Sequence, residues 1–133
     1  MPGTTPLYRK LGIKPNMVLQ LLNAPKEYWL FFEDVPEGIA QEDEDAPGLF
    51  EMVHLFCQTE AELLQWGKVG MDRITKHGML WVSWPKKTST LFQGLNPNQV
   101  RGHLRGLGLI DVKVCALTED WTAVKFMYRK ENR

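Results

Sequence analysis

Two adjacent lysines at the end of an apolar run are the residues best placed to do chemistry in this chain. Residues 79–84 read as a buried strand, and Pro85, Lys86 and Lys87 follow at once. Proline fixes the backbone where it leaves the sheet. Two ammonium groups beside hydroxyl side chains can hold a phosphate or a carboxylate, and the hydroxyls are those of Thr88, Ser89 and Thr90. The alternative is a strand end whose lysines are simply solvated.

Asn23 and Trp84 are the other candidate ligand contacts. Asn23 ends the first predicted strand, and its side-chain amide can either bond a ligand or cap the helix opened by Pro25. Capping is the interpretation that we favour. Trp81 and Trp84 stand three positions apart, so in a strand they face opposite sides of the sheet. One of them belongs to the core, and the other can line a pocket beside the lysines. The predicted ligand site therefore comprises Asn23, Trp84, Lys86 and Lys87.

The sequence shows no catalytic set, no metal site and no cofactor motif. Its three histidines fall in different predicted elements, and His54 lies inside an apolar strand, where a buried, hydrogen-bonded side chain is expected. Cys57 has no histidine predictably beside it to activate its thiol. Cys57 and Cys115 both stand in apolar runs, which favours free thiols in a reducing compartment.

Composition limits the classes of partner. The chain has 133 residues, which suits one domain over residues 1–133 with residues 1–6 as a mobile arm. Sixteen basic side chains balance sixteen acidic ones, and the arginines are dispersed, so we expect no binding to nucleic acid or to a membrane surface. We find no apolar signal core and no apolar run that could span a bilayer, and we expect a cytoplasmic protein.

The predicted elements alternate in type. Four helices are expected, at Leu7–Leu11, at Lys26 to about Glu33, from Thr59 to Gly78, and at Pro97–Leu107. In the third, Thr59 is the N-terminal cap, Lys76 and His77 lie in the last turn, and Gly78 ends the helix. Asn96 is the expected cap of the fourth. The strands are expected at Met17–Leu22, Ile39–Gln41, Phe50–Cys57, Met79–Trp84, Ile110–Leu117 and Trp121–Arg129.

This alternation predicts a Rossmann-like α/β fold in three layers, α/β/α. About six strands form a mostly parallel sheet in the order 2-1-3-4-6-5, and the C-terminal hairpin supplies an antiparallel strand, as in methyltransferases. Such an order places Lys86 and Lys87 just past the carboxyl end of a central strand. Open α/β sheets hold their ligands at that edge.

Four segments carry a resemblance to a known family: LGIKP at 11–15, LLNAP at 21–25, WVSWPKK at 81–87 and DVKVC at 111–115. Together they resemble a family of small bacterial proteins of unknown function, similar to pared-down class I methyltransferases. The resemblance implies that fold and no particular activity. Class I methyltransferases have a glycine-rich turn after the first strand, whereas this chain has Asn23, Ala24 and Pro25, and Pro25 lacks an amide proton. Their acidic residue after the second strand could come from Glu42–Asp45.

Three functions follow as hypotheses. The first is a non-catalytic domain that binds a small anionic ligand, or the acidic segment of a partner, at the lysine site. The alternative is an enzyme, a degenerate S-adenosylmethionine-dependent methyltransferase. The third is a structural protein that forms a homodimer through exposed aromatic residues.

Overall fold

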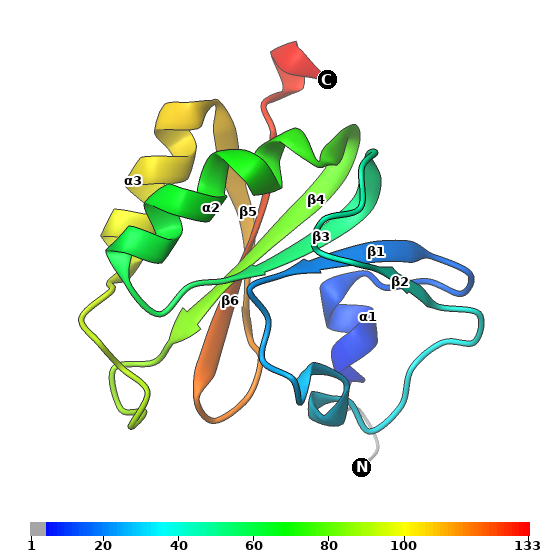
Figure 1. Ribbon diagram of the computed structural model, residues 1–133, viewed down its shortest axis with the longest axis horizontal. Helices are drawn as coiled ribbons and strands as arrows, with labels where there is room; N and C mark the ends of the chain where they lie inside the picture. The colour runs from blue at the N-terminus through cyan, green and yellow to red at the C-terminus, as the bar shows by residue number, and fades with distance from the viewer. Residues whose placement is uncertain (1–4) are drawn as a thin grey trace.

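Six strands form one sheet in the order β2-β1-β3-β4-β6-β5 in the computed structural model, which describes residues 5–133 (Figure 1). The strands are β1 (Val18–Leu22), β2 (Ala40–Glu42), β3 (Phe50–Phe56), β4 (Ile74–Pro85), β5 (Leu109–Ala116) and β6 (Trp121–Tyr128). The first four run parallel, and β6 is antiparallel to both of its neighbours. The predicted fold class and strand order are confirmed. Residues 1–4 of the predicted N-terminal arm lie outside the described residues.

Helices cover both faces of the sheet, as predicted. Helices α2 (Glu60–Asp72) and α3 (Pro97–Leu107) lie on one face, whereas α1 (Leu7–Leu11) and the short 3-10 helix η1 (Tyr28–Phe31) lie on the other (Figure 1). A second 3-10 turn, η2 (Lys130–Asn132), follows β6. Two apolar clusters result, one on each side of the sheet. Trp84 belongs to the cluster under α2 and α3, and Trp81 belongs to the cluster under α1 and η1, so the predicted opposite orientation of the two rings is correct.

The predicted C-terminal end of α2 is wrong. The helix stops at Asp72 and β4 begins at Ile74, so Lys76, His77 and Gly78 belong to the strand and not to a helix end. Ile74 is buried and pairs with Phe50 across a register irregularity in β3. In the strand, the Ile74 backbone pairs with β3 and its side chain is buried. This packing outweighs the local preference for a helix.

The predicted helix over 26–33 is reduced to η1, which spans Tyr28–Phe31. Tyr28 and Phe32 are both buried, and the backbone is already extended at Phe32, with φ −105° and ψ 130°. The Tyr28 ring meets the rings of Trp29, Phe32, His54 and Phe56 at centroid distances of 4.9 to 5.7 Å. Aromatic packing of this density fixes a tight turn where propensity alone favours a longer helix.

Two of the predicted helix caps, Thr59 and Asn96, are confirmed. Thr59 Oγ1 accepts the Glu62 N–H at 3.2 Å. Asn96 and Gln99 form a reciprocal capping box at the start of α3, with Pro97 as the first helical residue. Each cap satisfies backbone donors that the first turn of a helix leaves unpaired. Their residue types and spacing are purely local, which is why the sequence shows them.

Gly67 allows α2 and α3 to approach closely, and this gives a first prediction. A Cβ at Gly67 would lie 3.0 Å from His103 Nε2 and 3.2 Å from Leu104 Cδ2. We expect Gly67→Ala to lower the free energy of unfolding by about 1–2 kcal/mol, because the overlap outweighs the gain in helix propensity.

Gly102→Ala is the matched control, because a Cβ at this position in α3 meets nothing within 4 Å. It should raise the free energy of unfolding by about 0.5–1 kcal/mol. Urea titration followed by circular dichroism measures both variants. Shifts of the same sign in the two would contradict close packing of α2 against α3.

Candidate functional site

The carboxyl ends of three parallel strands meet at one edge of the sheet. β1 ends at Leu22, β3 at Phe56 and β4 at Pro85. After β1 the chain adds β2 on one side, and then adds β3 on the other side of β1. The strand order therefore reverses between β1 and β3. In open α/β sheets the crevice outside such a reversal is the usual ligand position.

Asn23 joins the two strand ends that border this crevice. Its side-chain Nδ2 donates to the Phe56 carbonyl at 2.8 Å, and its backbone N–H donates to Glu44 Oε2 at 2.7 Å. Its φ of +54° lies in the left-handed region, which asparagine tolerates better than most residues. The predicted helix cap is wrong, because η1 begins after Glu27 and has no side-chain cap. Asn23 instead pins the turn after β1 to the end of β3.

A hollow of about 200 Å³ lies at the strand-order reversal. The rings of Phe56 and Trp121 meet edge to face at 5.0 Å and supply aromatic surface. Glu62 is the one titratable side chain among the residues that line it, and its Oε1 accepts the Gln58 N–H at 2.6 Å. The full lining is Asn23, Ala24, Pro25, Phe56, Gln58, Glu62 and Trp121.

A second hollow, of about 240 Å³, lies on the other side of the same turn. Ala24 and Pro25 line both hollows. Its other neighbours include Tyr28, Gln41 and the Glu44 whose carboxylate binds the Asn23 amide. The turn after β1 thus lies between two small hollows. Its first backbone N–H, that of Asn23, is already bonded to Glu44.

Lys86 and Lys87 follow β4 on the same edge of the sheet. The Lys86 N–H donates to the Asp120 carbonyl at 2.7 Å, and Asp120 directly precedes Trp121 of the first hollow. Lys86 is half-buried and Lys87 is exposed. Among residues 5–133, neither ammonium group has a carboxylate within 4.0 Å. Of the hydroxyls predicted beside them, that of Ser89 donates to Asp120 Oδ1 at 2.8 Å.

Three of the four predicted site residues follow strand ends on the same edge of the sheet. Asn23 lines the hollow, and Lys86 and Lys87 follow β4 outside its lining. Trp84 is only 3% exposed and packs in the core under α2 and α3. Trp121, which the sequence analysis did not select, supplies the indole at this edge. The sequence could have indicated this role, because Trp121 is the first residue of the last predicted strand. In the structure it pairs with Pro85 at the end of β4.

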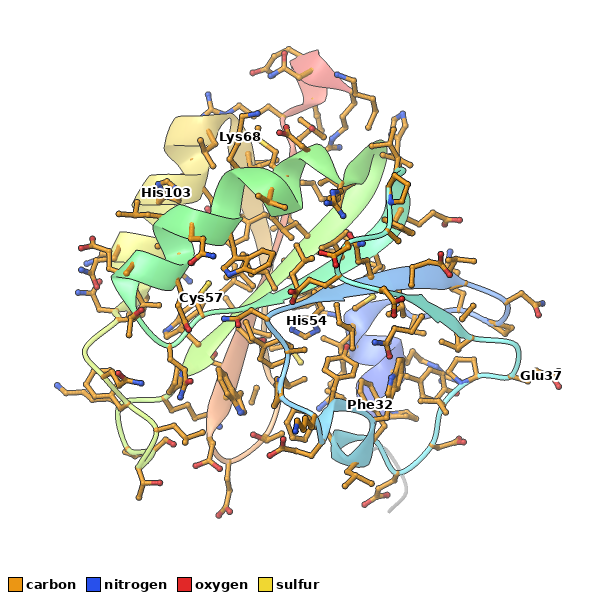
Figure 2. The ribbon with its side chains drawn as sticks, viewed as in Figure 1. Phe32, Glu37, His54, Cys57, Lys68 and His103 are labelled. Atoms are coloured by element: carbon orange, nitrogen blue, oxygen red, sulfur yellow. The ribbon has the colours of Figure 1, made fainter. Side chains whose placement is uncertain are left out.

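Neither of the reactive side chains nearby is activated. His54 is fully buried, with Nδ1 2.9 Å from the Tyr28 hydroxyl and Nε2 2.7 Å from Ser83 Oγ. Burial lowers the His54 pKa to about 3, so the ring is neutral, as predicted for a satisfied core histidine. Burial, and to a lesser extent Glu62, raise the Cys57 pKa to about 12. Figure 2 shows His54 inside the molecule on the α1 side, and Cys57 where β3 ends.

Within residues 5–133, no group of three or more His, Cys, Asp or Glu side chains is placed to hold a metal ion. Both cysteines are free and buried, as predicted. No helix in the described part of the chain is long and apolar enough to cross a bilayer. The side chains at this edge offer amides, ammonium groups, aromatic rings and the carboxylates of Glu44, Glu62 and Asp120.

No family model and no curated protein matches the sequence, so membership of the predicted bacterial family stays a prediction. Solved structures do match. A possible exported protein from Bordetella parapertussis gives a TM-score of 0.58 at 9% identity, over 92% of this chain and 65% of that one. A tRNA methyltransferase from B. subtilis gives 0.55 at 10% identity, over 92% and 65%.

A third match is the magnesium protoporphyrin IX methyltransferase from Synechocystis with bound SAH, with a TM-score of 0.57 at 8% identity, over 92% of this chain and 78% of that one. The chain spans 65% of the length of the first two proteins. At identities this low the likeness concerns the backbone alone. With the closing hairpin and the strand order described above, it shows that this chain has the methyltransferase-like Rossmann fold.

Proposed function

We propose that the protein is a non-catalytic binding domain for a small anionic ligand. The neutral part of the ligand occupies the hollow between Asn23 and Trp121, and its phosphate or carboxylate lies toward Lys86 and Lys87. The observation that carries this proposal is the pair of lysines after β4, without carboxylate partners among the described residues, on the sheet edge that also holds the hollow at the strand-order reversal.

The side chains around the hollow support this division of the ligand. Glu62 lines the hollow and repels an anion, so the charged group belongs on the side of the lysines. Gln58 and Asn23 offer polar contacts to the neutral part, and the Trp121 ring offers a stacking surface. The lysines equally fit the carboxylates of an acidic partner segment, which stays a prediction.

Catalysis is not part of the proposal, because no activated nucleophile faces the hollow. The His54 ring and the Cys57 thiol are buried and held in their neutral forms. Glu62 already accepts the Gln58 N–H at the start of α2, which is a structural use of its carboxylate.

The lysine pair gives the second prediction. Thermal shift and calorimetry with inorganic phosphate, nucleotides and coenzyme A identify a ligand. Lys86→Ala/Lys87→Ala should then weaken its binding by at least about 100-fold, because each of the two charge-assisted contacts contributes about 1.5 kcal/mol or more. Lys14→Ala/Lys130→Ala, at two exposed positions elsewhere, changes the net charge equally and should leave the affinity within about twofold. Equal losses in both double variants would remove the assigned site.

The alternative function is that of a degenerate S-adenosylmethionine-dependent methyltransferase. Its support is the fold, together with two hollows on either side of the turn after β1. Against it stand Pro25, which has no amide proton, and the Asn23 N–H, which Glu44 already occupies. Direct titration decides: saturable binding of S-adenosylmethionine would favour the enzyme, and no binding at millimolar concentration would exclude it.

A further inference from the structure

The β2 edge of the sheet carries an apolar hollow that the proposed function does not use. It measures about 290 Å³ and is lined by Trp29, Val35, Ile39 and Gln41. The Trp29 indole N–H donates to Gln41 Oε1 at 2.7 Å, which holds the ring in place. Val35 is 42% exposed, so its side chain is open to a partner. We call these four residues the edge groove.

The segment that forms the edge groove is the most acidic part of the chain. Every charged residue from 27 to 45 is acidic, and together they supply half of the sixteen acidic residues. None of them belongs to an ion pair within residues 5–133. Figure 2 shows Glu37 pointing outward from the loop that precedes β2. The full set is Glu27, Glu33, Asp34, Glu37, Glu42, Asp43, Glu44 and Asp45.

The groove also lies beside an open strand edge. β2 pairs only with β1, and all three of its residues, Ala40–Glu42, are exposed. The side of β2 away from β1 therefore offers unpaired backbone groups. An extended peptide can add to such an edge, with its backbone bonding the strand and alternate side chains entering neighbouring pockets.

We propose that the edge groove binds an extended, positively charged segment of a partner protein. Apolar side chains of that segment enter the hollow beside Trp29 and Val35, and its lysines or arginines face the acidic residues around it. A symmetric dimer through this edge is disfavoured, because it would bring the acidic segment of a second copy against this one. Charge thus selects a basic partner over a second β2 edge.

A synthetic ten-residue peptide that alternates valine and lysine is the direct probe. Calorimetry should show binding to the intact protein that weakens at least about tenfold between 50 and 300 mM salt. The same peptide with glutamate in place of lysine should not bind. Equal binding of the acidic peptide would overturn the proposal.

Val35→Ser tests the apolar contact, and Leu64→Ser, 58% exposed on α2, is its matched control on another surface. We expect the first to weaken the lysine peptide about tenfold and the second to change it less than about twofold. Equal effects of the two variants would overturn the proposal. So would sedimentation equilibrium that shows self-association which Val35→Ser abolishes, because a second copy would then occupy the groove.

Discussion

Replacing Trp81 with alanine should lower the free energy of unfolding by about 3–5 kcal/mol, a large share of the about 5–15 kcal/mol that stabilises a typical domain. Trp81 is fully buried in β4, at the centre of the sheet, between His54 of β3 and Lys125 of β6. Its indole N–H donates to the Leu11 carbonyl at 2.9 Å and so ties α1 to the sheet. The substitution removes both the ring and this link.

Trp81→Phe separates the two contributions. It keeps most of the apolar ring but leaves the buried Leu11 carbonyl unpaired, for an expected loss of about 1–3 kcal/mol. Trp29→Ala, at a half-buried position in η1, is the matched control for loss of an indole at a less buried site. Urea titration at pH 7 ranks the three variants. A loss for Trp29→Ala as large as that for Trp81→Ala would show that neither the burial of Trp81 nor its bond to Leu11 sets the cost.

The second large effect is acid destabilisation through His54. Burial lowers its pKa from 6.5 to about 3, so below pH 6.5 the unfolded chain binds a proton that the folded chain does not. The stability that His54 contributes is fully present above pH 6.5 and is lost as the pH falls toward about 3. The slope is about 1.4 kcal/mol per pH unit, which gives about 2 kcal/mol between pH 6.5 and pH 5.

Denaturant titrations at several pH values test this prediction. His54→Gln should be less stable at pH 7, because it disturbs the bonds to Tyr28 and Ser83, yet it should show a flatter dependence on pH above pH 5. His77→Gln removes an exposed histidine and should keep the original slope. An unchanged slope in His54→Gln would mean that another group controls stability in this range.

Much of the fold was predictable because its signals are local. Caps and strand-ending prolines mark the start of α3 and the end of β4, and apolar runs mark β1, β3 and β4. The errors arose where distant packing decided the conformation. The pairing of Ile74 with Phe50 shortens α2, and the burial of Tyr28 and Phe32 reduces a helix to η1.

The position of the candidate site was predictable in part, because it follows from the strand order. Topology alone brings Asn23, Lys86 and Lys87 to one edge, because carboxyl ends of parallel strands meet there. Which tryptophan faces that edge depends on the turn that leads into β6. The contact between Glu44 and the Asn23 amide spans 21 positions in the sequence. No short-range pattern predicts such a contact, although it determines whether the Asn23 N–H is free to bind a ligand.

Backbone amide chemical shifts recorded by NMR during ligand titration test the central claim most directly. Inorganic phosphate or coenzyme A should shift the amides of Lys86, Lys87 and Trp121 in a saturable way, and Lys86→Ala/Lys87→Ala should abolish the response. S-adenosylmethionine at millimolar concentration should shift none of the amides around the turn after β1. Saturable shifts of Asn23 and Ala24 with S-adenosylmethionine, and none at the lysines with any anion, would contradict the account.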